Sequence, residues 1–273
     1  MATTIDRFVE LHRAGCFVIP NAWDAGSAKI LHHLGFHAIA STSAGFAFTL
    51  GRPDRIDALS LDDKLAHLRA LAAATPLPVN ADFQAGFAAD ASGVAASVAA
   101  CVATGVAGLS IEDATGDAAH PLYERAEAIE RLRAARRAID ASGVPVVLTA
   151  RCEAVLVGAP DGERIVMDRL VAFAEAGADC LFAPGVMDPA GIAAIVKAVA
   201  PKPVNVLLSR PVAGLDVARL AELGVRRISV GSALARVALG AALRAAKRLA
   251  DTGSFDGLAD ATPFPELNAI FAK

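Results

Sequence analysis

The stretch PVNADFQAGF, Pro78–Phe87, begins as a buried strand and ends in a glycine-containing turn, and its apolar run stops at one carboxylate, Asp82. Segments with helical periodicity separate it from similar runs before and after it. Continuous apolar strands that alternate with amphipathic helices indicate a parallel sheet covered by helices. Eight such runs predict an α/β fold of the TIM (β/α)8 barrel type. They are CFVIPN (16–21), HAIAST (37–42), LPVNAD (77–82), AGLSIED (107–113), VPVVLTAR (144–151), ADCLFAP (178–184), KPVNVLL (202–208) and RRISVGS (226–232).

The length of the chain and the positions of the glycines that end its helical segments agree with one barrel. The 273 residues are 55% hydrophobic and 20% charged, which is typical of a globular chain with one large core. No linker or low-complexity tract interrupts them, so we expect a single barrel domain over residues 1–273. Helical segments end at Gly35, Gly105, Gly177 and Gly224, which predicts short turns at the bottom of the barrel.

Charge and cysteine usage exclude several classes of protein. The net charge is −3 and the Lys and Arg residues do not cluster strongly, so a nucleic-acid surface is not expected. The four cysteines lie far apart without a CxxC pair, which argues against a zinc site and a disulfide scaffold. No apolar run reaches the length of a membrane span. We therefore expect a cytoplasmic protein with a small-molecule ligand and no membrane partner.

Polar residues gather where the predicted strands end, and in a TIM barrel these ends meet at the face that carries the active site. Asp82 and Glu112 end neighbouring strands, and Asp54 lies in the long loop after the second strand. Three carboxylates without histidine or thiolate suit a hard cation such as Mg²⁺. Alternatively, these acids cap helices or pair with Arg151. The full set is Asn21, Asp24, Ser41, Thr42, Ser43, Asn80, Asp82, Glu112, Asp113, Arg151, Glu153, Asn205 and Ser232.

Three further features indicate how an anion would be bound. Arg151 ends the fifth strand, and its guanidinium suits a carboxylate or phosphonate, although a salt bridge to Glu112 or Glu153 is an equally open reading. The small residues of STSAG (41–45) offer backbone N–H groups to an oxyanion such as an enolate. His120, in the loop after the fourth strand, is a candidate for proton transfer or substrate contact. Cys152 is expected to be buried filler.

Four segments resemble motifs of the isocitrate lyase and phosphoenolpyruvate mutase superfamily. They are STSAGFAFTLGRPD (41–54), PVNADFQAGF (78–87), GLSIEDATGD (108–117) and LTARCEA (148–154), which match the small-residue loop, DxD strand, ED strand and arginine strand. The resemblance runs over most of the chain, from Phe17 to Arg236. It implies an extra N-terminal helix, and a C-terminal helix exchanged between the subunits of a dimer or tetramer. It also implies Mg²⁺, or Mn²⁺ in its place, and a small 2-oxo carboxylate ligand.

The resemblance also assigns roles to individual residues. Ser43 and Ala44 match the backbone contacts to an oxyanion, Asp82 matches the second acid of DxD, and Arg151 matches the substrate-binding arginine. The resulting candidates are catalytic Arg151, Asp54 and His120; substrate-binding Thr42, Ser43, Ala44, Arg151 and Asn205; and metal-binding Asp82, Glu112, Asp54 and Asn80.

Two departures from the family pattern narrow the function. Asn80 stands where DxD has its first acid, and the loop ATGDAAHPLYE (114–124) lacks the cysteine of the isocitrate and methylisocitrate lyases. The leading hypothesis is a Mg²⁺-dependent lyase or hydrolase that cleaves a C–C bond of a small 2-oxo or 2-hydroxy dicarboxylate through an enolate. One alternative is P–C chemistry, as a phosphonopyruvate hydrolase or a phosphonomutase. Another is a non-catalytic barrel that binds a carboxylate.

Overall fold

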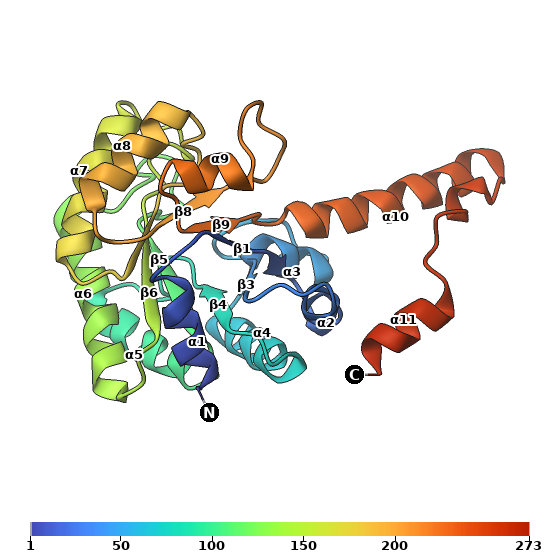
Figure 1. Cartoon of the computed structure of the whole chain (residues 1–273), viewed down its shortest axis with the longest axis horizontal. Helices are drawn as coiled ribbons and strands as arrows, with labels where there is room; N and C mark the ends of the chain where they lie inside the picture. The colour runs from blue at the N-terminus through green and yellow to red at the C-terminus, as the bar shows by residue number, and fades with distance from the viewer. Residues whose placement is uncertain (1, 273) are drawn as a thin grey trace.

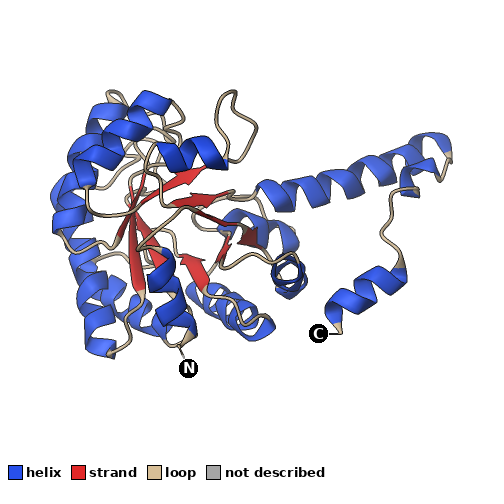
Figure 2. Ribbon diagram, viewed as in Figure 1, coloured by secondary structure: helices blue, strands red, loops and turns tan. Residues whose placement is uncertain are grey.

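The strands of the chain form one parallel sheet that curls round on itself, with helices on its outer side (Figures 1 and 2). This computed structural model describes residues 2–272. The strands are β1 (Phe17–Ile19), β2 (Asn21–Ala22), β3 (Ile39–Ser41), β4 (Val79–Asp82), β5 (Gly108–Glu112), β6 (Val147–Arg151), β7 (Cys180–Phe182), β8 (Val204–Leu207) and β9 (Arg227–Ser229).

The helices alternate with the strands, as the periodicity predicts. They are α1 (Thr4–Leu11), α2 (Ala25–His33), α3 (Ser43–Thr49), α4 (Leu61–Ala74), α5 (Ala91–Val102), α6 (Arg125–Ser142), α7 (Gly162–Glu175), α8 (Pro189–Val199), α9 (Val217–Glu222), α10 (Ala233–Thr252), the 3₁₀ helix η1 (Asp256–Leu258) and α11 (Phe264–Phe271).

The barrel closes at Pro20, which divides the first predicted strand into β1 and β2. The β1 strand pairs with β9 and the β2 strand pairs with β3, so together they join the two edges of the sheet. Proline has no amide hydrogen to donate, but the Pro20 carbonyl still accepts from the Ala40 N–H at 2.9 Å. The predicted TIM barrel is therefore confirmed, and its first predicted strand is present as the two short strands β1 and β2.

The loop after β3 is more ordered than the sequence suggested, because it contains the short helix α3. Thr42 caps this helix by accepting the Gly45 N–H on its side-chain oxygen at 3.2 Å. The Phe46 ring stacks on His67 of α4 with ring centroids 3.9 Å apart. The stacking holds α3 against α4, and the Ser43 N–H, which donates to Asp82 at 2.8 Å, holds the beginning of α3 beside the end of β4.

The lower interior of the barrel is closed by α1, the extra helix that the family resemblance implies. A capping box at Thr3 begins the helix. Phe8 is fully buried, and its ring packs edge-on against His12 and Phe17. Small residues in or just before the strands, among them Ala38, Ala40 and Ala107, complete this lower cluster. The open end of the barrel is therefore the opposite one, where the strands end.

The last helices form an arm that leaves the barrel. Figure 1 shows α10 projecting outward and α11 returning toward α2. Over its twenty residues α10 buries one side chain, Ala235. At the far end of the arm, Lys29 of α2 donates to the Phe271 carbonyl at 3.0 Å. The tail after Gly253 thus contacts the barrel. Over residues 2–272, no helix combines the length and apolar character that crossing a bilayer requires.

We expect Gly108→Ala to destabilise the protein. A Cβ at this position would lie 2.5 Å from Phe8 Cε1, 2.6 Å from Asn80 Oδ1 and 3.2 Å from the Val147 carbonyl oxygen, inside a packed barrel. Overpacking of this kind costs about 1–3 kcal/mol of unfolding free energy, measurable by urea denaturation. Gly26→Ala is the control, because its Cβ would meet no atom closer than 3.5 Å. Equal stability of the two variants would contradict this packing.

Candidate active site

The open end of the barrel contains a cavity of about 200 Å³ that draws residues from almost every strand. It contains seven of the predicted site residues. These are Thr42, Ala44, Asp54, Asn80, Asp82, Arg151 and Asn205. The convergence follows from the parallel sheet, because the ends of all its strands face the same side.

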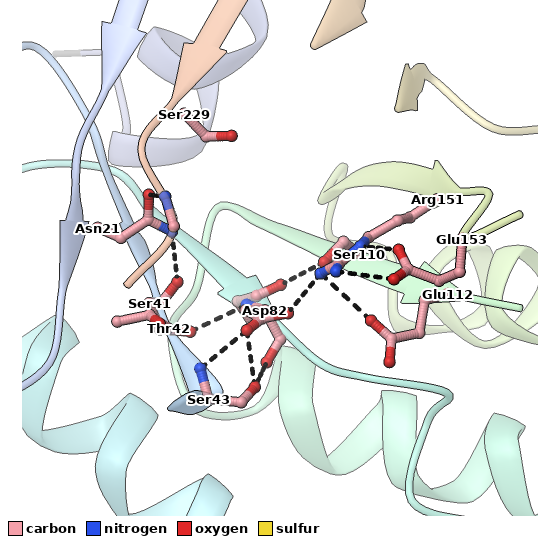
Figure 3. Close-up of polar contacts among 12 residues, drawn as sticks. Asn21, Ser41, Thr42, Ser43, Asp82, Ser110, Glu112, Arg151, Glu153 and Ser229 are labelled. Atoms are coloured by element: carbon pink, nitrogen blue, oxygen red, sulfur yellow. Dashed lines mark hydrogen bonds and ion pairs between the residues drawn. The ribbon is translucent and has the colours of Figure 1, made fainter. Parts of the chain in front are cut away.

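Arg151 is the centre of a buried ion cluster (Figure 3). Its Nε and Nη2 donate to the two carboxylate oxygens of Glu153, the second of these at 3.1 Å. Its Nη1 lies 3.2 Å from Glu112 Oε2 and 3.5 Å from Asp82 Oδ1. The guanidinium carbon also lies 5.3 Å from the centre of the Phe182 ring. Both salt bridges that the sequence left open are present, and Asp82 adds a third.

Asp82 is held as an anion by groups on three other elements, α3, α4 and β6. Its Oδ2 accepts from the Ser43 N–H at 2.8 Å and from the Ser43 hydroxyl at 2.7 Å (Figure 3). Burial acts to raise its pKa, but Lys64, Arg151 and the Ser43 hydrogen bonds together bring the pKa below its ordinary value. The Ser43 N–H that the resemblance assigns to an oxyanion thus donates to Asp82 here.

Asn80 lies two residues before Asp82 on the same inner face of β4, one step deeper in the barrel. The side chain is 5% exposed, and its Oδ1 has no hydrogen-bond donor among the residues described. Asn80 therefore brings a neutral, unpaired amide oxygen to the cavity at the position of the family's first acid.

Of the predicted catalytic residues Asp54 and His120, the first lies at the cavity and the second does not. Asp54 lines the outer part of the cavity, and its pKa is raised by partial burial and by the nearby charge of Asp82. His120 is on the surface, with 85% of its side chain exposed, and its Nδ1 lies 3.4 Å from Asp117. The structure does not bring His120 to the cavity.

Other strand-end residues have structural roles. Asp24 caps α2 through a capping box with Ser27. Asp113 accepts from the Glu153 N–H and from Arg169, both at under 3 Å, so it fixes the chain just after Arg151. Cys152 is fully buried, as expected of a filler.

Sequence reasoning missed two buried cations near this site, Lys64 and Arg227. Lys64 of α4 is fully buried, and its Nζ donates at 3.3 Å to the Ser41 hydroxyl, which in turn accepts the Asp82 N–H at 2.9 Å. Its sequence signal is a lysine on the apolar stripe of Leu61, Leu65 and Leu68. Arg227 is 2% exposed and lines the inner part of the cavity. Its sequence signal is a charged residue two positions before Ser229, a spacing that places both side chains on the same inner face of the strand.

A family profile described as phosphoenolpyruvate phosphomutase matches residues 8–250 of this chain. The chain belongs to this family. The resemblance read from its motifs is therefore confirmed, and the relatives of this phosphomutase-family chain include both lyases and mutases.

Individual relatives of this family member show how varied the chemistry is. A candidate lyase/mutase from Burkholderia cenocepacia has a solved structure that is 45% identical, with a TM-score of 0.94 over 99% of this chain and 96% of that one. An oxaloacetate decarboxylase from Rhodopseudomonas palustris is 32% identical over 78% of this chain and 73% of its own. A phosphonopyruvate hydrolase solved with oxalate and Mg²⁺ is 25% identical, with a TM-score of 0.87 over 99% of this chain and 95% of that one. The activities named for these relatives support the prediction that this chain is an enzyme.

We expect Glu112 to make the stability of this protein fall as pH rises. Burial raises the pKa of Glu112 from 4.5 to about 8, helped by Glu153 and Asp82 and opposed by Arg151. The folded state then keeps a proton that the unfolded state has released, so this stabilising contribution is complete below the unfolded pKa and is lost as pH rises through the folded pKa. Between about pH 5 and pH 8 the loss should exceed about 1 kcal/mol.

The comparison is Glu112→Gln, whose amide does not titrate. Urea denaturation of both proteins in EDTA, at several pH values across this window, should show a steeper decline in unfolding free energy for the wild type. Parallel pH dependences would contradict the raised pKa.

Proposed function

We propose that this protein is a Mg²⁺-dependent lyase or hydrolase that cleaves a C–C bond of a small 2-oxo or 2-hydroxy dicarboxylate, such as oxaloacetate or a substituted malate, through an enolate. The observation that carries the proposal is the meeting of Asp82 and Glu112 at one nitrogen of Arg151, beside the cavity and next to the first turn of α3. Carboxylates, a guanidinium and backbone N–H groups at one small cavity form a site for an oxygen-rich anion.

The residues at the cavity fit a hard cation. Asp82 and Glu112 each direct an oxygen toward the same Arg151 nitrogen, and Asn80 Oδ1 is a buried acceptor without a donor. Among residues 2–272, no three His, Cys, Asp or Glu side chains form a metal-binding group by themselves. Water and substrate oxygens would complete the shell, which is how Mg²⁺ is commonly bound. We assign Asp82 and Glu112 to the ion, with Asn80 and Asp54 around it.

The chain's own groups have separate roles in this proposal. Bound Mg²⁺ would act as a Lewis acid that polarises the 2-oxo group. The Ala44 N–H group would face the oxygen on which negative charge develops, while Ser43, whose N–H donates to Asp82, would hold that acid in place. Thr42 fixes the helix turn that carries both residues. Arg151 would attract the carboxylate next to the reacting carbon. Asp54, whose pKa is raised by partial burial and by Asp82, lines the cavity and would exchange a proton with the substrate.

The proposal predicts metal-dependent turnover of a dicarboxylate. Oxaloacetate, substituted malates and phosphonopyruvate are offered with Mg²⁺ or with EDTA, and keto-acid, oxalate and phosphate products are measured. We expect C–C cleavage that EDTA abolishes and that Asp82→Asn lowers at least about a hundredfold, because a charged group facing the transition state is lost. Asn80→Asp should strengthen Mg²⁺ binding.

The other outcomes separate the alternatives. Phosphate release from phosphonopyruvate without turnover of dicarboxylates would favour P–C chemistry, which one solved relative's substrate name suggests. Neither metal binding nor turnover, in the wild type and in Asn80→Asp, would leave a non-catalytic carboxylate-binding barrel.

We also propose that the arm built by α10 joins subunits. Its exposed apolar side chains include Val237, Leu239 and Leu243, and Phe255 follows just after the helix. Exposed apolar side chains on an arm that stands clear of its own barrel are typical of an interface between copies of a chain. Exchange of this arm between the subunits of a dimer or tetramer would cover it.

The matching prediction concerns oligomeric state. Leu243 is 70% exposed, and Leu243→Asp should shift the protein toward monomer in light scattering coupled to gel filtration, because a charge would be buried at the contact. Leu34→Asp is the control, since Leu34 is a 65% exposed leucine on the barrel itself. A wild-type monomer, or an equal effect of both substitutions, would contradict the interface.

A further inference from the structure

The barrel interior contains a second arginine, Arg227, beneath the ion cluster of Arg151. It lies at the start of β9, 2% exposed, and lines the same cavity. Its Nε donates to Asn205 Oδ1 at 2.9 Å, and its Nη2 donates to Thr149 Oγ1 at 3.0 Å. On its other side, Nη1 lies 3.3 Å from Nε2 of His12, a residue just after α1. Arg227 is therefore fixed between the helix that closes the barrel and the cavity above.

The partners of Arg227 are all neutral. The His12 Nδ1 lies 2.7 Å from the Phe8 carbonyl oxygen, so that nitrogen carries the proton and Nε2 is left as an acceptor. Burial lowers the pKa of His12 to about 3, with the charge of Arg227 adding to the effect, so the imidazole is neutral at ordinary pH. Asn205 and Thr149 carry no charge. No carboxylate within residues 2–272 forms an ion pair with Arg227.

The other buried arginines differ in this respect. Arg169 is 2.8 Å from Asp113, Arg151 has three carboxylates, and even Arg131, held mainly by carbonyl groups, has Glu127 at 3.8 Å. A buried cation without a counter-ion is costly to the fold. Three acceptors are present for the five N–H groups of the Arg227 guanidinium, so hydrogen-bonding capacity also remains. An anion from outside the chain would balance the charge of Arg227 and accept hydrogen bonds from its remaining N–H groups.

The walls near Arg227 favour a small anion. Asn80, Ser110, Asn205 and Ser229 line the cavity as neutral polar groups. An acid at position 80 would place a negative charge in this same cavity, and here the residue is an amide. The volume of about 200 Å³ is below the roughly 300–1,000 Å³ of sites for drug-sized ligands, so the occupant is small. The two oxygens of a carboxylate match the guanidinium fork of Arg227.

We propose that Arg227 is a substrate-binding residue that holds the second carboxylate of a small dicarboxylate at the inner end of the cavity. The inference rests on the proposed function for the identity of the substrate. Its reacting end would lie at Arg151 and Asp82, and its remote carboxylate would lie on Arg227. Asn205, which donates to Ser229 at 2.9 Å while accepting from Arg227, would position the guanidinium. A substrate whose reacting end binds Mg²⁺ at the Arg151 cluster and whose second carboxylate lies on Arg227 is then favoured over one that lacks the second carboxylate.

The test is binding of malonate, a dicarboxylate probe, in EDTA by isothermal titration calorimetry. The wild type should bind malonate, and Arg227→Gln should weaken malonate binding about tenfold or more, as loss of a hydrogen-bonded charge predicts. Arg226→Gln is the matched control. It removes the same charge from a neighbouring residue that donates to the Gly15 carbonyl outside the cavity, and it should leave binding unchanged. Arg227→Lys should keep part of the affinity.

The outcomes decide the proposal without reference to turnover. A folded Arg227→Gln protein with wild-type affinity for malonate would overturn it, as would tighter binding of inorganic phosphate than of malonate by the wild type. If the variants do not fold, crystals of the wild type soaked with malonate in EDTA decide: a carboxylate on Arg227 supports the assignment, and malonate on Arg151 alone refutes it. Absence of catalysis together with malonate on Arg227 would refute only the proposed function.

The variant Asn80→Asp provides a second, independent test of the proposal. In EDTA the new carboxylate would compete with malonate for the positive charge of Arg227, so affinity for malonate should fall severalfold. Unchanged or tighter malonate binding by this variant in EDTA would count against Arg227 as the anion-binding group. Because Mg²⁺ is absent, this result is separate from the stronger metal binding expected of the same variant.

Discussion

The buried ion cluster of Arg151 is the interaction on which the geometry of the cavity depends. Its carboxylates come from the ends of β4 and β5 and from the residue that follows Cys152, so one guanidinium connects three neighbouring segments. Removing one member of such a cluster leaves the others buried without compensation, which is why buried pairs are costly to break. Lys64 and Ser43 extend the cluster behind Asp82, and they connect it to α4 and α3. The position of the acids is therefore determined by charge balance as much as by the strands.

Charge balance also divides the cavity into two zones. Around Arg151 the acids outnumber the cation, and the neighbouring acids add to burial in raising the pKa of Glu112. Around Arg227 there is no acid at all among the residues described, and the neighbouring histidine is kept neutral. A cation suits the first zone and an anion suits the second. A ligand that brings Mg²⁺ to one end and a carboxylate to the other would complement both.

The sequence was sufficient for the barrel because strand formation in a parallel sheet leaves a direct trace. Each strand is a short apolar run, and most of the runs end in a polar residue that the parallel arrangement carries to the same face. This rule placed Asp82, Arg151 and Asn205 together without any coordinates. It failed for Lys64, whose side chain reaches the site from a helix, and for Arg227, which begins a strand instead of ending one. It also misdirected attention to His120, because loop position does not determine where a side chain lies.

Asn80 has a different meaning once these zones are known. From sequence alone it is the family's first acid replaced by a weaker ligand, which is a loss for metal binding. In the structure its unpaired amide oxygen lies in the cavity that Asp82, Arg151 and Arg227 also line. A carboxylate there would neutralise the buried arginine from within the chain and reduce its attraction for an external anion. The amide can still offer its oxygen to a cation. Asn80 therefore costs the metal site one negative charge, but it leaves the positive charge of Arg227 free to attract the substrate.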